Sequence, residues 1–129
     1  MTIRWLLRAG SCCLACWFAL LGCQPAAEQL APVKGRVVYR GRPLQGGTVV
    51  FIPDTSRGTH GSLAVADIQV DGTFTLKTND ILGAVPGHHK VTVSSLQPQT
   101  PLKYSDPHRS GVTCEVIAHK TNTVELELQ

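Results

Sequence analysis

Apolar and polar residues alternate along most of the chain after residue 32, with the period of two that is typical of half-buried β-strands. The alternation predicts seven short strands, at 33–40, 48–52, 63–70, 73–77, 89–94, 112–118 and 124–128. In the second of these, 49–52 is apolar on both faces, which indicates a central position in a sheet. Because no helical period follows residue 32 and turn residues recur between the strands, we expect an all-β, seven-stranded antiparallel β-sandwich.

Two connections between the predicted strands stand out. Asp71-Gly72 lies between two alternating segments and predicts a hairpin, since Gly adopts positive φ at low cost. Residues 96–111 form a long loop with three prolines, and loops over about 12–15 residues are often functional. Its varied hydrogen-bonding groups make it a candidate interaction surface: Lys103, Tyr104, Asp106, His108 and Arg109. The alternative is that Tyr104 packs on the sandwich, Asp106 caps a turn, and the loop only covers an open end.

The first 22 residues follow a different pattern. Arg4 and Arg8 precede an uninterrupted apolar run of 13 residues, 9–21, and small Gly22 follows the run. This order is typical of a secretory signal peptide. The rival interpretation, an uncleaved transmembrane helix, is disfavoured because a span needs about 20 residues.

The sequence Leu20-Leu21-Gly22-Cys23 resembles the lipobox of bacterial lipoproteins. The resemblance implies cleavage before Cys23, a diacylglycerol thioether on its sulfur, and acylation, such as palmitate, of its new N-terminus. We therefore expect a lipoprotein signal peptide over 1–22, a lipidated Cys23 with a flexible tether over 23–32, and one folded domain over 33–129. Lipid on Cys23 would hold the protein on a membrane, in the cell envelope and facing the extracytoplasmic space.

Charge and cysteine content exclude further classes. The net charge is +3, and the 12 cations minus Arg4 and Arg8 leave 10 against 9 anions, so we expect no nucleic-acid partner. Of the five cysteines, only Cys114 would remain free after cleavage and lipidation. It shares the inward parity of Val112, Val116 and Ala118, so we expect a core thiol and no disulfide.

Four cations follow the outward parity of the first predicted strand and its turn: Lys34, Arg36, Arg40 and Arg42. One interpretation is an anionic-surface strip that binds a membrane or an envelope polymer. The other, which we favour, is that the charges protect an edge strand from pairing with other chains.

Catalytic and metal-binding patterns are not found in the sequence. His88 and His89 are adjacent, so on a strand they point to opposite faces, and no H-E-x-x-H occurs. No G-x-S-x-G elbow is present either. We expect no metal, no cofactor, no catalytic residue and no enzymatic activity.

The segment 33–53 resembles the opening of carboxypeptidase regulatory-like domains, with Gly41-Arg42-Pro43-Leu44 as a G-x-P-L turn and Gly47 to Phe51 as G-x-V-x-F. Asp71 to Leu76 is similar to the D-G-x-F-x-L hairpin of that family, and Pro86 to Val91 to its P-G-x-Y-x-V strand entry, with His89 in place of an aromatic residue. The resemblance implies a transthyretin-like (prealbumin-like) sandwich that serves as a noncatalytic accessory module.

These observations together predict a noncatalytic, lipid-anchored module of the cell envelope with a structural or protein-binding role, holding another envelope protein. One alternative is a small-molecule hydrolase of the transthyretin-related type, although 124–129 does not match the Tyr-Arg-Gly-Ser tail of hydroxyisourate hydrolases. The other alternative is envelope-polymer binding through the basic strip. The sequence leaves the oligomeric state open.

Overall fold

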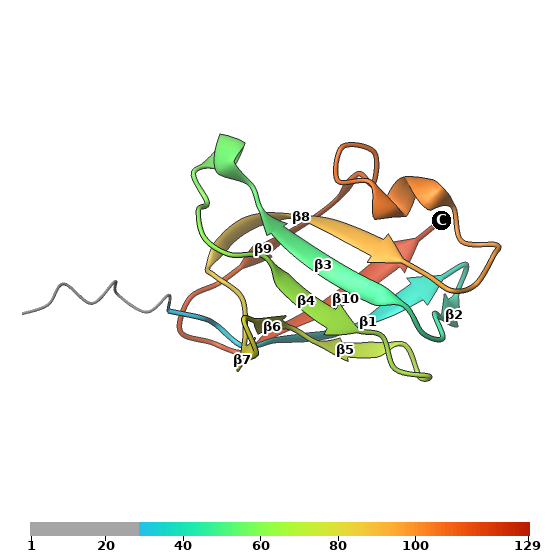
Figure 1. Ribbon diagram of the computed structural model, residues 1–129. Coiled ribbons are helices and arrows are strands. Elements are labelled where there is room, and N and C mark those ends of the chain that lie inside the picture. The colour runs from blue at the N-terminus through green and yellow to red at the C-terminus, as the bar shows by residue number, and fades with distance from the viewer. Residues whose placement is uncertain (1–28) are drawn as a thin grey trace, which may run out of the picture.

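A computed structural model of the protein describes residues 29–129. The predicted signal peptide, Cys23 and most of the tether lie outside the described residues. The fold of residues 29–129 is all-β: two sheets face each other across one apolar layer, with two short 3₁₀ turns and no α-helix in this part of the chain (Figure 1).

The smaller sheet has four strands in the order β10-β1-β2, with β5 also paired to β1. Its members are β1 (Val33–Tyr39), β2 (Arg42–Pro43), β5 (Thr73–Thr75) and β10 (Asn122–Leu128). The larger sheet has six strands in the order β7-β6-β4-β3-β8-β9. Its members are β3 (Thr48–Pro53), β4 (Ala64–Asp67), β6 (Lys77–Thr78), β7 (Ile81–Leu82), β8 (Gly87–Ser94) and β9 (Val112–Val116). The 3₁₀ turns are η1 (Thr55–Arg57) and η2 (Leu102–Ser105).

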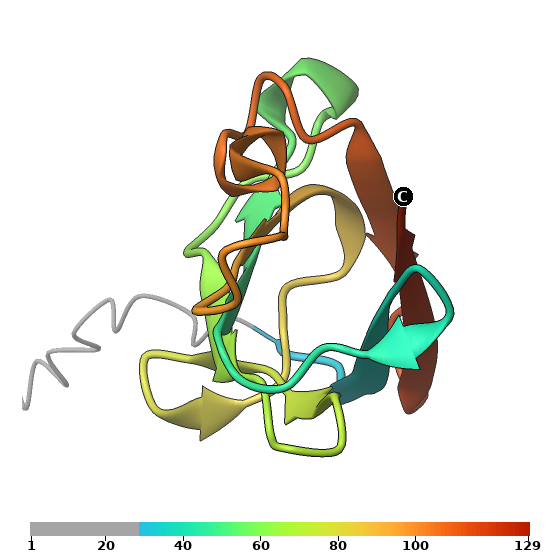
Figure 2. The same ribbon diagram turned by 90° about the vertical axis from the view of Figure 1, so that its right-hand side faces the viewer.

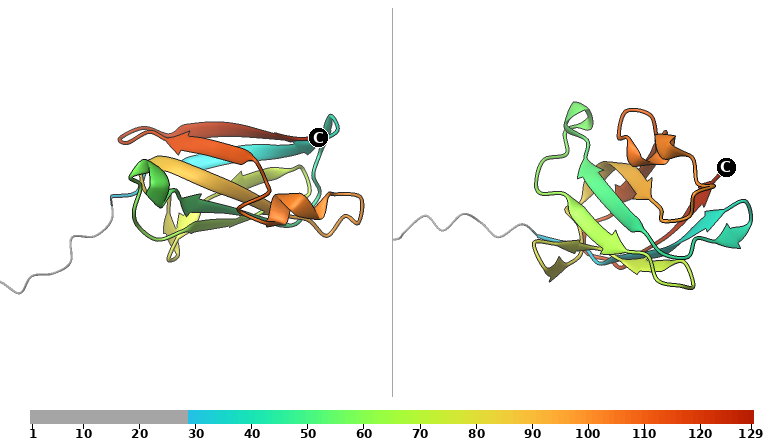
Figure 3. Two further views of the ribbon diagram at one scale, coloured as in Figure 1. Left: turned by 90° about the horizontal axis from the view of Figure 1, so that it is seen from above. Right: turned by 45° about the vertical axis from the view of Figure 1, so that its right-hand side comes forward.

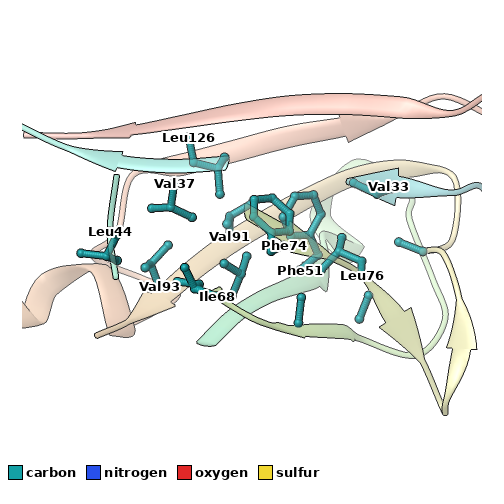
Figure 4. Packing of buried hydrophobic residues seen from close by; sticks show 14 of the residues in the cluster. Val33, Val37, Leu44, Phe51, Ile68, Phe74, Leu76, Val91, Val93 and Leu126 are labelled. Atoms are coloured by element: carbon teal, nitrogen blue, oxygen red, sulfur yellow. The ribbon is translucent and has the colours of Figure 1, made fainter. Parts of the chain in front are cut away.

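The alternating pattern located the main strands correctly. β1, β3, β8 and β10 coincide with predicted strands, and their inward residues form the core that fills the space between the sheets (Figure 4). The prediction that the apolar run 49–52 lies in a central strand is confirmed, because β3 is paired with β4 on one side and β8 on the other.

The direction of one strand pair was predicted wrongly. β1 and β10 run parallel, in register from Val33 opposite Asn122 to Tyr39 opposite Leu128, so the sandwich is not purely antiparallel. Alternation shows which residues face the core but carries no information on strand direction. A parallel neighbour needs a long crossover connection, and here nearly the whole chain lies between the two strands.

The strand count was also wrong, because residues 29–129 contain ten strands instead of seven. The additional ones are two residues each: β2 and β7 lie in segments that read as turns from the sequence, and β6 begins at Lys77, the last residue of the predicted strand 73–77. The predicted strand 73–77 is split because the chain passes from the smaller to the larger sheet at Leu76, whose side chain is fully buried between them.

The turn at Asp71-Gly72 does not close a hairpin of paired strands. Gly72 has φ +85° and the Gln69 N–H donates to the Thr73 carbonyl at 2.8 Å, so the predicted turn is present. However, β4 before it belongs to the larger sheet and β5 after it to the smaller one. The turn is therefore a corner of the sandwich, where a strand switches sheets.

Two aromatic rings occupy the middle of the core (Figure 4). The Phe51 and Phe74 ring centroids are 6.4 Å apart, and the rings are tilted by 51°. Gly35 of β1 makes room for Phe74, since a Cβ at residue 35 would meet the Phe74 ring at 2.8 Å. Packing in the core therefore requires a glycine at position 35.

Cys114 and Ala118 are less buried than the sequence predicts. β9 ends at Val116, and Ala118 is exposed in the turn that follows, so its inward placement was wrong. Cys114 is half-buried and packs against the core from an edge strand. Burial, with a smaller contribution from the Glu115 charge, raises the pKa of the Cys114 thiol.

Candidate functional site: the end of the sandwich opposite the tether

The described chain enters the sandwich at one end, and the interaction candidates gather at the other (Figures 1 and 3). At the entry, Ala31 is buried and pairs with Ala84 through two backbone hydrogen bonds of 2.9 and 3.0 Å. At the opposite end lie the β1–β2 turn, the loop 95–111 and the last residue of β10 (Figure 2). We call this the distal end.

The loop 95–111 is fastened to the sandwich by Tyr104. Its side chain is 5% exposed, its hydroxyl donates to the Gln129 carbonyl at 2.8 Å, and the Gln129 N–H donates to the same oxygen at 2.9 Å. The Ser110 hydroxyl donates to the Val91 carbonyl at 2.7 Å. These bonds fix both the 3₁₀ turn and the end of the loop against strands of the two sheets.

Asp106 organises the turn after η2. Its Oδ1 accepts from the His108 N–H at 2.8 Å, and its carbonyl accepts from the N–H groups of Arg109 and Ser110. Of the five loop residues that the sequence proposed as a surface, Tyr104 and Asp106 therefore hold the loop in shape. Lys103, His108 and Arg109 remain exposed, with the Lys103 ammonium 5.0 Å from the Tyr104 ring centroid.

Two leucines of this loop were missed by the sequence analysis. Leu96 is 88% exposed and Leu102 is 85% exposed, which are the highest values among the large apolar side chains of residues 29–129. Both lie in the proline-containing loop and follow no strand period. An apolar residue in a loop without strand periodicity was therefore the signal in the sequence that could have identified these two exposed leucines. The loop is thus held in place by hydrogen bonds while it exposes two leucines.

The four cations of the predicted basic strip are divided between two places. Lys34 and Arg36 lie on the outer face of the smaller sheet, where Lys34 is paired in register with Thr75 and Thr123, and Arg36 with Thr73 and Glu125. Because β1 is paired on both sides, it is not an edge strand, and edge protection was the wrong explanation for its charges.

Arg40 and Arg42 lie at the distal end instead. They line a surface hollow between the β1–β2 turn and the 95–111 loop, together with Tyr39, Pro43, Gln45, Gln97, Pro98 and Gln99. The Arg40 guanidinium is 5.3 Å from the Tyr39 ring centroid, and the Tyr39 hydroxyl donates to the Gln99 carbonyl at 2.9 Å. Within residues 29–129 neither arginine forms an ion pair, although Glu127 lines a neighbouring hollow with Arg40.

The histidines are separated as their parity predicts. His88 is half-buried on the outer face of β8, whereas His89 is 1% exposed in the core, with its ring centroid 5.7 Å from that of Phe51. Its Nε2 lies 2.8 Å from the Val85 carbonyl, which assigns the proton to that nitrogen, and buried Nδ1 has no partner. Burial holds the pKa of His89 below its usual 6.5. In the part of the chain that the structure describes, no three His, Cys, Asp or Glu side chains come together as metal ligands do.

These features define a two-sheet, all-β sandwich, with the distal end opposite the end where residues 29–32 enter it. Across residues 29–129 there is no helix with the length and apolar character needed to cross a bilayer. No protein-family profile matches the chain, and no curated protein matches it in sequence. Among solved structures, a DUF3823 family protein from Parabacteroides merdae is similar in fold, with a TM-score of 0.48 and 16% sequence identity. The likeness covers 78% of this chain and 46% of that protein, so the chain spans about half of its length.

Proposed function

We propose that this chain is a noncatalytic lipoprotein module of the cell envelope, with a transthyretin-like domain of the carboxypeptidase regulatory-like type, that binds another envelope protein through its distal end. Its place in the envelope rests on the lipobox-like sequence before Cys23, and its binding role rests on the distal loop. The type of domain rests on the resemblance of the segments 41–44, 47–51, 71–76 and 86–91 to motifs of that family, and these segments contribute to both sheets.

The observation that carries the binding role is the exposure of Leu96 and Leu102 on a loop that Tyr104 holds in place. Exposed leucines on a mobile loop would lose conformational entropy on binding, but a loop already fixed by hydrogen bonds has much of this cost removed. Burial of exposed apolar side chains in a contact is favourable, by about 25 cal/mol for each Å² of apolar surface removed from water.

The geometry of the tether supports this orientation. Seven residues separate Cys23 from Ala31, so eight residue steps join them and span at most about 29 Å. A lipid on Cys23 would therefore keep the Ala31–Ala84 end close to the membrane. The distal end would face away from the bilayer, where another envelope protein can reach it.

Site-specific photo-crosslinking in cells tests this function. A photoreactive amino acid replaces Leu96 or Leu102 in the full chain, and as a matched control it replaces Leu82, which is also well exposed but lies in β7. We expect one defined protein adduct from positions 96 and 102 and none of that mass from position 82. Equal adducts from all three positions, or none at the distal end, would contradict the proposed function.

A further inference from the structure

We propose that the protein bound at the distal end presents an acidic segment, whose carboxylates contact Arg40 and Arg42 in the hollow beside the 95–111 loop. This inference rests on the proposed function and names the chemistry of the partner. It starts from two guanidinium groups, two residues apart in the β1–β2 turn, that line one hollow.

Neither guanidinium has a carboxylate partner within residues 29–129. Two like charges that line one hollow repel each other, and an anion placed between them removes the repulsion. The guanidinium group is planar and forms paired hydrogen bonds with a carboxylate, a geometry that a lysine does not provide. Tyr39 restrains Arg40 from one side, since the guanidinium lies 5.3 Å from its ring centroid. Restraint of this kind lowers the entropy cost of binding.

The rest of the hollow fits a polypeptide. Gln45, Gln97 and Gln99 line it, and side-chain amides both donate and accept hydrogen bonds, as a peptide backbone requires. Gln97, Pro98 and Gln99 line the hollow with the arginines and follow Leu96 directly in the chain, so an exposed apolar residue adjoins the hollow in sequence. An acidic segment that also carries apolar side chains is complementary to both the arginines and the leucines.

An acidic polysaccharide or a phosphate polymer is complementary in charge to the arginines but not to the leucines. Such polymers have no apolar side chains to cover Leu96 and Leu102. The four aromatic side chains of residues 29–129 are all buried, so none of them is an exposed ring on which a sugar could stack. A membrane surface is also disfavoured, because the arginines lie at the end opposite the point where the tether enters (Figure 1).

The test uses the Leu96 photo-crosslinker in cells, in three backgrounds of the full chain: the native sequence, Arg40→Glu with Arg42→Glu, and Arg57→Glu. Arg57 is an exposed arginine of η1, remote in sequence from the hollow, so its variant is the matched control for a change of charge. We expect the double variant to reduce the adduct at least tenfold and the control to change it less than twofold. The crosslinked peptide, identified by mass spectrometry, should carry adjacent Asp or Glu residues. Replacing these by Lys should restore the adduct in the double variant.

The outcomes separate the two proposals. If position 96 gives no protein adduct in the native background, the proposed function fails. If the adduct forms and persists in the double variant, or if its peptide carries no acidic residues, the function stands and the acidic segment is refuted. Circular dichroism of each variant checks its fold. If the Glu pair does not fold, Arg40→Gln with Arg42→Gln replaces it, with the same loss of adduct expected.

Discussion

Acidification just below neutral pH should destabilise this domain through the buried ring of His89. Its ring is buried between the sheets, its Nε2 donates to the Val85 carbonyl, and its Nδ1 has no acceptor or donor nearby. Protonation would place a charge beside the Phe51 ring, and the core residues around it are apolar. Burial is the largest cause of the lowered pKa; the Val85 carbonyl opposes the shift, and the neighbouring His88 reinforces it.

The sign of the effect follows from linkage. The folded-state pKa of His89 lies below the value of about 6.5 in the unfolded chain, so the unfolded chain binds its proton first as pH falls. The stabilisation is complete above about pH 6.5 and decreases below it, until the pH reaches the lowered folded pKa. Between these two pKa values the free energy of unfolding falls by up to about 1.4 kcal/mol per pH unit.

The assay is urea unfolding of the full chain, followed by far-ultraviolet circular dichroism at pH 7.5, 6.5 and 5.5. Because the domain contains other histidines, the informative quantity is the difference from His89→Gln, which keeps an N–H donor for the Val85 carbonyl and cannot be protonated. We expect this variant to lose most of the pH dependence, and His60→Gln, a change at an exposed histidine, to retain it. An unchanged pH dependence in His89→Gln would refute the reasoning.

Three further predictions concern the loop, the core and the thiol. Tyr104→Phe removes both hydrogen bonds to Gln129 and should lower the free energy of unfolding by about 1–3 kcal/mol, measured by urea unfolding. Gly35→Ala should lower it by about 1–3 kcal/mol or more, because the new Cβ would meet the Phe74 ring and the Val124 carbonyl oxygen. The Cys114 thiol, half-buried with a raised pKa, should react with a maleimide more slowly in the folded protein than in urea at the same pH.

Matched controls accompany these variants. Tyr39→Phe removes one hydrogen bond, to the Gln99 carbonyl, and should cost less than Tyr104→Phe. Gly58→Ala adds a Cβ in open space at φ +78° and should cost about 1 kcal/mol through backbone strain alone. If Tyr39→Phe or Gly58→Ala lowers the free energy of unfolding as much as its test variant does, the argument from the Gln129 hydrogen bonds or from the packing at Gly35 is wrong. If native Cys114 reacts as fast as the unfolded thiol, the argument from its burial is wrong.

The sequence was sufficient to predict which strand residues point into the core, but not which strands pair with each other. Val33, Val37 and Tyr39 were assigned to the core from period two alone, and they are buried. The parallel pairing of β1 with β10 is a long-range property that a local pattern does not contain. Likewise, Leu76 looks like any inward strand residue, although the chain changes sheets there.

The candidate site was predictable only in outline. The length and prolines of 96–111 marked the loop, and the structure added which residues hold it and which are displayed. Arg40 and Arg42 appeared to continue a strip from Lys34, because parity was counted through a turn. Arg40 has φ +51°, and this left-handed residue ends the strand periodicity, so the two arginines lie at the distal end.

The intact mass of the protein extracted from the membranes of its own host tests the central claim most directly, since the anchor fixes which end of the sandwich is free. The account predicts a chain that begins at Cys23 and carries the added mass of a diacylglyceryl group and an amide-linked acyl chain. A Cys23→Ala variant should lack this mass and leave the membrane fraction. A mature chain that retains residues 1–22, or that begins elsewhere without acyl groups, would contradict the account.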